Sequence, residues 1–213
     1  MLKIDCISDT HGQHSKLGLP GGNILIHAGD FSPPDTEVED VLAFLDWFQS
    51  QKYACHILVA GNHDGFFDLI PEAMEEECRK RGIFLLNDSG AEVEKIKIWG
   101  SPVQPGPSDW PFSRNRGKDI KRHWDLIPEN TEILITHGPP YQIRDEIHPG
   151  EHVGCKELYD RILQAKIKLH VFGHVHLGAG YLYQDNCLYV NASSGFTRVI
   201  IKNGCYKIYD HLS

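Results

Sequence analysis

The stretch that decides the fold is Cys55-His56-Ile57-Leu58-Val59-Ala60-Gly61-Asn62-His63-Asp64, an apolar β-branched run that ends in a polar cluster. Four other apolar runs end in the same way, and each reads as a strand: residues 2–8, 23–28, 132–135 and 169–172. The clusters that follow them are Asp9-Thr10-His11, Gly29-Asp30, Thr136-His137 and Gly173-His174-Val175-His176. Residues just past the carboxyl ends of neighbouring strands converge on one rim of an α/β sheet, where ligands bind. We therefore expect all five clusters to meet.

The side chains in these clusters are typical ligands of borderline metal ions. Seven of them offer oxygen or nitrogen donors and none is a thiolate: Asp9, His11, Asp30, Asn62, His137, His174 and His176. Such a set fits Mn, Fe, Zn or Co better than a cysteine-rich structural zinc site. Each pair alone is weak evidence, because loop aspartates often cap helices and histidines often only form hydrogen bonds. Together, the seven side chains are more ligands than one metal ion requires, and they predict two ions that share a carboxylate.

The order of strand and helix signals predicts an α/β fold. Residues 36–49 form an amphipathic helical pattern with a capping box at Thr36 and Glu39, and residues 71–81 form a second helix that ends at Gly82. Shorter strand-like pieces follow at 83–86, 91–93, 95–99, 181–183, 187–191, 199–201 and 205–209. Two sheets packed face to face, with helices outside both, accommodate this order in a single domain over residues 1–213.

Two local signals refine this picture. Lys202-Asn203-Gly204 predicts a hairpin turn between the last two strands. The segment from Gly100 to Gly117 is rich in proline and glycine, and so long a loop in a compact domain is usually functional or disordered. Because it carries Trp110, Arg114 and Arg116, we expect it to be functional.

Composition restricts the class of partner. With 21 Lys and Arg against 29 Asp and Glu, the formal net charge is −8. An acidic chain disfavours nucleic-acid polymers and anionic membranes, although bound cations could still attract a small anionic substrate. No apolar run approaches the roughly 18 residues of a membrane span, and the first residues enter a strand without a signal-peptide pattern. The 6 cysteines lack any C-x-x-C pair and read as reduced, so we expect a cytoplasmic protein.

The complete pattern D-x-H…G-D…G-N-H-D…T-H-G…G-H-x-H, from Asp9 to His176, resembles the calcineurin-like metallophosphoesterase superfamily. This resemblance implies a four-layer α-β-β-α sandwich of two packed mixed sheets and a dinuclear metal site. It also implies ligand sets: Asp9, His11 and His176 for one metal, Asn62, His137 and His174 for the other, and Asp30 as the bridge. His63 would be a histidine that faces the substrate without binding metal.

A narrower resemblance is to the small metallophosphoesterase-domain-containing (MPPED) branch, whose members are linked to the hydrolysis of phosphodiesters, including cyclic nucleotides. The motifs that carry it are Arg116-Gly117, Trp124, Ile127-Pro128, Thr136-His137-Gly138-Pro139-Pro140, His152-Val153-Gly154-Cys155, His170-Val171-Phe172 and Asn191-Ala192-Ser193. The chain departs from the usual Trp-Ala-Phe stretch of this branch at Trp110-Pro111-Phe112, in the loop expected to shape substrate choice.

These features predict a dinuclear metal-dependent phosphodiesterase acting on small diesters such as cyclic nucleotides. The cofactors would be two divalent or trivalent ions, with manganese favoured in vitro. A hydroxide bridging the two ions, next to Asp30, would attack phosphorus in line with the leaving oxygen. His63 would act as general acid, with Asp64 or a nearby carbonyl fixing its tautomer.

Substrate contacts are expected from four side chains. Asn62 borders the phosphoryl site, and the forked donors of Arg114 and Arg116 could clasp a phosphate or ribose. His152 could face the substrate, support another side chain or lie at the surface. Two alternatives stay open: a phosphomonoesterase or nuclease with the same site, and a non-catalytic metal-binding scaffold. The sequence does not indicate the oligomeric state.

Overall fold

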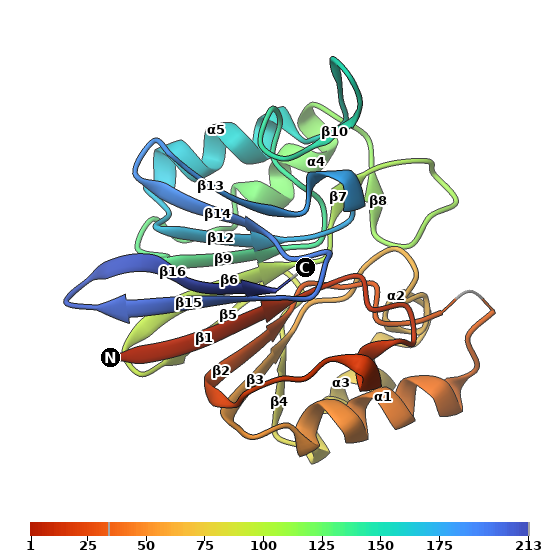
Figure 1. Ribbon diagram of the computed structural model, residues 1–213. Helices are drawn as coiled ribbons and strands as arrows, with labels where there is room; N and C mark the ends of the chain where they lie inside the picture. Colours follow the sequence, from red (N-terminus) through yellow and green to blue (C-terminus); the bar gives the residue numbers. More distant parts are fainter. Residues whose placement is uncertain (34, 213) are drawn as a thin grey trace.

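A computed structural model describes residues 1–33 and 35–212, with side chains through residue 209. Two six-stranded mixed sheets pack face to face, and helices cover the outer side of each (Figure 1). This is the four-layer α-β-β-α arrangement predicted from the sequence. Within the described part of the chain, no helix is long and apolar enough to cross a bilayer.

The first sheet contains most of the N-terminal half. Its strand order is β16-β15-β1-β2-β3-β4, in which β1 to β4 run parallel. β15 pairs antiparallel with β1, and β16 pairs antiparallel with β15 at the edge. The strands are β1 (Leu2–Ile7), β2 (Gly22–His27), β3 (Tyr53–Leu58), β4 (Ile83–Leu85), β15 (Phe196–Lys202) and β16 (Cys205–Leu212). Three helices follow in the connections: α1 (Val38–Ser50), α2 (Phe66–Leu69) and α3 (Pro71–Lys80). Phe44 and Phe48 of α1 and Met74 of α3 are buried against the outer face of this sheet.

The second sheet has the order β13-β14-β12-β9-β6-β5. Its four central strands are parallel, and the edge strands β5 and β13 are antiparallel to their neighbours. The strands are β5 (Ser89–Val93), β6 (Ile96–Ser101), β9 (Ile133–Thr136), β12 (Leu169–Phe172), β13 (Gly180–Gln184) and β14 (Cys187–Asn191). Helices α4 (Lys118–Trp124) and α5 (Lys156–Ala165) bury Trp124, Leu158 and Ile162 against its outer face.

The period of two along each strand divides the apolar residues between two layers of core. In β2, Ile24 and Ile26 face the opposite sheet, whereas Leu25 between them faces the helices. Parallel strands covered on both faces must be apolar on both sides. This is why the runs in the sequence are almost continuously hydrophobic, and why they end abruptly at the rim.

Four short strands and two 3₁₀ turns of the described chain lie outside the two sheets. β7 (Gln104–Pro105) and β8 (Ser113–Arg114) form a short parallel pair, and β10 (Glu146–His148) and β11 (Glu151–His152) form a hairpin that projects from the molecule in Figure 1. Short 3₁₀ turns occupy His14–Lys16 and His176–Gly178. The segment Gly100–Gly117 therefore contains paired strands within its irregular course.

Two local predictions can be compared with the structure. The hairpin turn is confirmed, because Asn203 and Gly204 have φ values of 53° and 74° between β15 and β16, as a tight hairpin requires. The position of the capping box was wrong by one residue. The Glu37 backbone N–H donates to the Asp40 carboxylate at 3.0 Å, and the helix begins at Val38, while the Thr36 hydroxyl donates to the carbonyl of Pro33.

Candidate metal centre

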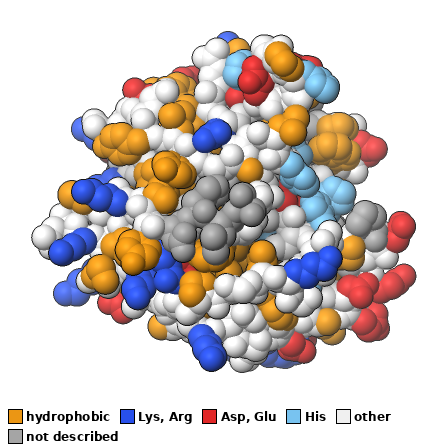
Figure 2. Space-filling view, in the orientation of Figure 1, with side chains coloured by type: hydrophobic (Ala, Val, Ile, Leu, Met, Phe, Trp, Pro, Cys, Tyr) orange, Lys and Arg blue, Asp and Glu red, His pale blue; other side chains and the backbone are white. Residues whose placement is uncertain are grey.

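The five polar clusters lie at the carboxyl ends of five strands drawn from both sheets. Asp9 and His11 follow β1, Asp30 follows β2, and Asn62 follows β3 in the first sheet. His137 follows β9, and His174 and His176 follow β12 in the second sheet. Because both sheets present these ends at the same rim, the candidate ligands meet at the seam between them, where Figure 2 shows histidine side chains at the surface.

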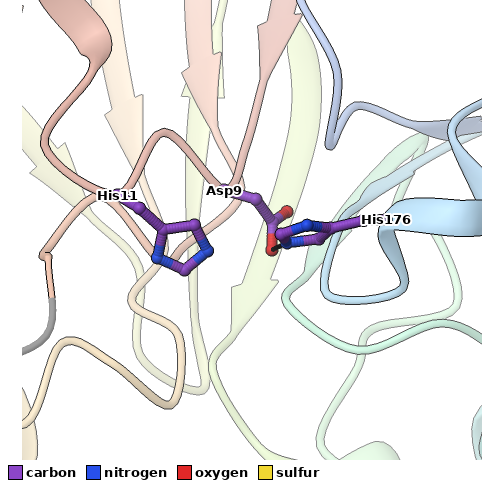
Figure 3. A group of neighbouring side chains, drawn as sticks. All are labelled: Asp9, His11 and His176. Atoms are coloured by element: carbon purple, nitrogen blue, oxygen red, sulfur yellow. Dashed lines mark hydrogen bonds and ion pairs between the residues drawn. The ribbon is translucent and has the colours of Figure 1, made fainter.

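One group of possible ligands consists of Asp9, His11 and His176. Each offers a ligand atom, and these atoms all lie within 4.8 Å of one another. The Nε2 atom of His176 lies 3.2 Å from Oδ1 of the buried Asp9 carboxylate. Figure 3 shows Asp9 pointing toward His176, although the two residues come from opposite ends of the sequence, with the His11 ring beside them.

A second group consists of Asp30, His137 and His174, again with ligand atoms within 4.8 Å of one another. His137 Nε2 lies 3.2 Å from Asp30 Oδ2 and 3.1 Å from the side-chain oxygen of Asn62. Asp30 also belongs to a third group with His11 and His63. It therefore lies between the two ligand groups, as a bridging carboxylate must.

Ligand-bearing backbone adopts conformations that are rare for residues with a side chain. The φ angles of Asp9, His11, Asp30 and His174 are 53°, 41°, 57° and 68°, in the left-handed region. Residues other than glycine seldom occupy this region, and such outliers cluster at functional sites. The strained turns aim these side chains back over the strand ends.

Glycines make room for the ligands. A Cβ on Gly61 would collide with the Asp30 carboxylate, and a Cβ on Gly173 would collide with that of Asp9. A Cβ on Gly29, whose φ is 98°, would lie 2.6 Å from Nδ1 of His137. The glycine in each G-D, G-N-H-D and G-H-x-H motif is thus required by the close approach of backbone to ligand.

Hydrogen bonds leave the correct ring nitrogens free for a metal. The Nδ1–H of His137 donates to the carbonyl of Ala28 at 2.8 Å, and His11 Nδ1 lies 3.3 Å from the carbonyl of Ser32. In both rings Nε2 then carries the lone pair that a metal needs and points into the site. The donor set and its orientation fit a pair of metal ions.

Burial and charge set the protonation of the centre. Burial raises the pKa of Asp30, but the charge of His137 and hydrogen bonds outweigh it and hold the carboxyl ionised. Burial lowers the pKa of His137, but the opposing charge of Asp30 raises it to about 9. His174 has its pKa lowered to about 4, by burial and then by the charge of His137. The ionised Asp30 thus keeps His137 protonated, and the positive charge of His137 compensates the charge of the buried carboxylate. A metal ion that binds here would displace the proton from His137.

His63 lies at the open side of the centre. Its side chain is 42% exposed, its Nε2 is 4.0 Å from Oδ2 of Asp30, and its ring contacts that of His11 edge-on at 4.9 Å between centroids. The His63 backbone N–H donates to Asp30 Oδ1 at 2.8 Å, which fixes the turn. A half-exposed imidazole beside the bridging carboxylate is placed to reach a substrate.

Of the two partners expected to fix the tautomer of His63, Asp64 or a nearby carbonyl, the structure gives Asp64 a different role. Asp64 is buried and accepts hydrogen bonds from the backbone N–H groups of Asp30, Gly61 and Ser32, at 2.8, 2.7 and 3.0 Å. Among the described residues, no hydrogen bond joins it to the His63 ring. Asp64 instead holds the β2 and β3 turns together and so positions Asp30 and Asn62.

The predicted substrate-binding arginines have different surroundings. A cavity of about 670 Å³ adjoins the centre, and its lining includes His174, Trp110, Arg114 and Arg116. The Arg114 Nε–H donates to His123 Nε2 at 3.3 Å, and its Nη1–H donates to the Ser113 carbonyl at 2.7 Å.

Arg116 and His152 both form polar contacts with other residues of the chain. The guanidinium of Arg116 donates to the carbonyls of Gly154 and Val153, at 2.7 and 2.5 Å. His152 Nδ1 pairs with the buried Asp145 carboxylate at 2.7 Å, which raises the pKa of the histidine. Arg116 therefore braces the wall of the cavity, and His152 anchors the β10–β11 hairpin beside it.

Two further buried residues, His27 and Gln104, organise the site, and sequence reasoning missed Gln104. The buried His27 lies 3.1 Å from the hydroxyl of Thr10 and accepts from the Gly29 backbone N–H at 3.2 Å, linking the first two ligand turns. Gln104 donates to the side-chain oxygen of Asn62 at 3.0 Å. Gln104 gave no signal because it lies in the proline-rich loop, outside the five strand ends.

Comparisons with known proteins agree with this geometry. Residues 2–178 match the family model described as calcineurin-like phosphoesterase. Metallophosphoesterase domain-containing protein 1 of Homo sapiens is 37% identical over 211 residues, which cover 88% of this chain and 64% of that protein. A UPF0046 protein of Caenorhabditis elegans is 32% identical over 204 residues, covering 90% of this chain and 69% of the relative. The chain thus spans somewhat less than two thirds of the human relative.

Solved structures share the fold at low sequence identity. The protein TT1561 of Thermus thermophilus has a TM-score of 0.67 at 15% identity, with 98% of each chain covered. A protein described as a novel archaeal phosphodiesterase has a TM-score of 0.54 at 14% identity, with 98% of this chain and 99% of that one covered.

Proposed function

The chain belongs to the calcineurin-like phosphoesterase family, and from this premise we propose that it is a metal-dependent phosphodiesterase acting on small diesters such as cyclic nucleotides. One observation carries the proposal. Two groups of possible ligands, Asp9 with His11 and His176 and Asp30 with His137 and His174, converge from turns of both sheets. A non-catalytic scaffold has no need of so complete a set, nor of a half-exposed histidine beside it.

The residues present fit two metal ions. Asp9, His11 and His176 would hold one ion, Asn62, His137 and His174 the other, and Asp30 both. When bound, two such cations would supply Lewis acidity to the phosphoryl oxygens and would lower the pKa of bound water to about 7. Oxygen and imidazole donors without thiolate favour Mn, Fe, Zn or Co, and we propose manganese for assays in vitro.

The chain's own residues would bind, orient and protonate. His63 would give its proton to the leaving alkoxide, because it faces outward next to Asp30. Asp64 would hold Asp30 and Asn62 in position, because its carboxylate accepts hydrogen bonds from the backbone of both turns. Trp110 contacts the His174 ring edge-on at 5.9 Å between centroids and forms part of the cavity that would take the organic group.

Arg114 would meet the anionic part of the substrate at this cavity, whereas Arg116 and His152 would act by holding its wall. The net charge of −8 argues against a nucleic-acid polymer as substrate. The cysteines are free, which supports the proposal of a reducing, cytoplasmic compartment.

The test is hydrolysis of bis(4-nitrophenyl) phosphate by the purified chain with Mn²⁺, with chelator, and by an Asp9→Asn variant. We expect activity only with Mn²⁺ and a loss of at least about 100-fold in the variant, accompanied by lower manganese content. A panel of 2′,3′- and 3′,5′-cyclic nucleotides, linear diesters and monoesters then separates the diesterase from a monoesterase or nuclease. A manganese-loaded protein inactive on the whole panel would be a scaffold.

A further inference from the structure

The side-chain amide of Gln104 forms a hydrogen bond through its nitrogen but not through its oxygen. Its amide nitrogen donates to the side-chain oxygen of Asn62 at 3.0 Å, next to the second ligand group. Its carbonyl oxygen, Oε1, is buried and has no hydrogen-bond partner among the described residues. The whole residue is only 1% exposed. An unpaired acceptor at such a position costs free energy unless a ligand or water satisfies it.

Gln104 lines the cavity beside the metal centre. Gln104 and Gly138 are both part of the cavity lining, and a Cβ on Gly138 would lie 3.5 Å from Oε1. Because Gly138 has no side chain, it places no further atoms beside Oε1. His174 lines the same cavity, so a molecule bound there touches both Gln104 and the centre.

The backbone fixes Gln104 in place. It begins β7, which pairs with β8 in parallel, and its N–H donates to the carbonyl of Phe112 at 3.2 Å. Rotation of the amide is opposed because it would break the bond to Asn62 and set two oxygen atoms against each other. Oε1 can therefore act only as an acceptor, and it recognises a donor.

We propose that Gln104 is a specificity-determining residue that selects phosphoesters carrying a hydroxyl or amine donor next to the esterified oxygen. This inference rests on the proposed function and deepens it. The phosphoryl group lies at the metal centre, the organic group lies in the cavity, and the neighbouring donor hydrogen-bonds to Oε1. A substrate without that donor leaves Oε1 buried and unpaired, and sites built in this way reject such analogues.

The experiment compares a matched pair of compounds that differ by one hydroxyl, 3′,5′-cyclic AMP and its 2′-deoxy analogue. Each is measured as a substrate and as a competitor of bis(4-nitrophenyl) phosphate hydrolysis by the manganese-loaded protein. For the unaltered chain we expect about tenfold preference for the ribose compound. For Gln104→Met, which keeps the length of the side chain but removes both polar atoms, we expect the preference to disappear.

Controls separate recognition from metal binding and folding. Gln184→Met, at an exposed position on β13, should keep the full preference. Manganese affinity, followed by electron paramagnetic resonance, should weaken in Gln104→Met because Asn62 loses its donor. The preference is therefore measured for each protein at saturating Mn²⁺, as the ratio of the rates for the two compounds.

Equal treatment of the two compounds by the unaltered chain, or an unchanged preference in Gln104→Met, would overturn the inference while leaving the phosphodiesterase intact. Absence of hydrolysis of every ester would instead overturn the proposed function.

Discussion

The residues of the metal centre are held in place by groups that do not bind metal themselves. Ala28 and Ser32 carbonyls set the orientation of His137 and His11, and three backbone N–H groups hold Asp64. Ligand basicity and direction depend on such partners, and their loss typically costs about 10- to 100-fold in metal affinity or activity. His63 differs from these residues because it faces outward.

At the residue scale, replacing His63 with Gln separates protonation from metal binding. General acid catalysis contributes about 10²–10⁴-fold, so kcat for alkyl phosphodiesters should fall by that factor. Hydrolysis of nitrophenyl esters should fall much less, because nitrophenolate leaves without a proton. Manganese content should be unchanged. Equal losses with both kinds of ester would exclude His63 as the general acid.

The buried His170 makes the metal-free fold sensitive to acid. Burial lowers the pKa of His170 to about 3, so this ring stays neutral in the folded state while the unfolded chain protonates it near pH 6.5. The unfolded state then binds more protons, and stability falls as the pH drops from about 6.5 toward 3, by up to about 1.4 kcal/mol per pH unit.

In the variant His170→Phe, the unfolding free energy should therefore decline less steeply between about pH 6 and 4. The difference in slope should correspond to the uptake of up to about one proton fewer on unfolding. Urea titrations in chelator at several pH values measure this slope. An identical slope in both proteins would show that His170 has the same pKa in the folded and unfolded states, and so takes up a proton in the folded state as well.

At the element scale, the turns after the strands carry the ligands, and glycine makes these turns possible. Gly61 and Gly173 allow the turns to pass within contact of the Asp30 and Asp9 carboxylates. We expect Gly61→Ala to weaken Mn²⁺ binding by at least about tenfold, because the added methyl group must displace Asp30. Gly18→Ala is the matched control, since nothing lies within 4 Å of that Cβ and its backbone is ordinary. Calorimetric titration with Mn²⁺ measures both; equal affinities would contradict the packing argument.

The elements that could be predicted from the sequence are those with a strong apolar pattern. The five strands that precede the ligands were identified because their runs end at polar clusters, and the converging ends followed from parallel topology. The start of α1 was misplaced because Thr36-x-x-Glu39 and Glu37-x-x-Asp40 are overlapping candidates for a cap, and only the packing of the helix decides between them.

The rest of the site depends on contacts that no local pattern encodes. The β7–β8 pair has two residues in each strand and lacks any period, so neither it nor the contact of Gln104 with Asn62 could be predicted. Arg116 carried the correct residue type for phosphate binding, yet its forked donors meet two backbone carbonyls. Asp64 follows a ligand in the sequence, but its partners are the backbone N–H groups of Asp30 and Ser32, which no sequence pattern reveals.

At the scale of the whole molecule, the centre joins the two sheets. Asp9, Asp30 and Asn62 follow strands of the first sheet, and His137, His174 and His176 follow strands of the second. Metal that binds the folded chain alone stabilises it by about 2.7 kcal/mol at about 100 times the dissociation constant. For a chain of this size that corresponds to a rise of about 5–10 °C in Tm.

Thermal unfolding followed by circular dichroism, with Mn²⁺ and then with chelator, measures this shift. The Asp9→Asn variant should show a much smaller one. A Tm that does not respond to manganese in the unaltered chain would mean that the two sheets do not share a metal site.

The placement of ligands on both sheets also determines the order in which the ribosome adds them to the chain. When Asn62 has emerged, the nascent chain carries the carboxylates but none of the histidines that follow β9 and β12. Those histidines leave the exit tunnel only after His176 has been made, and β15, which pairs with β1, comes later still. We therefore expect metal to bind only after residue 176 has been made, because a chain that stops before residue 174 lacks His174 and His176, one candidate ligand for each ion.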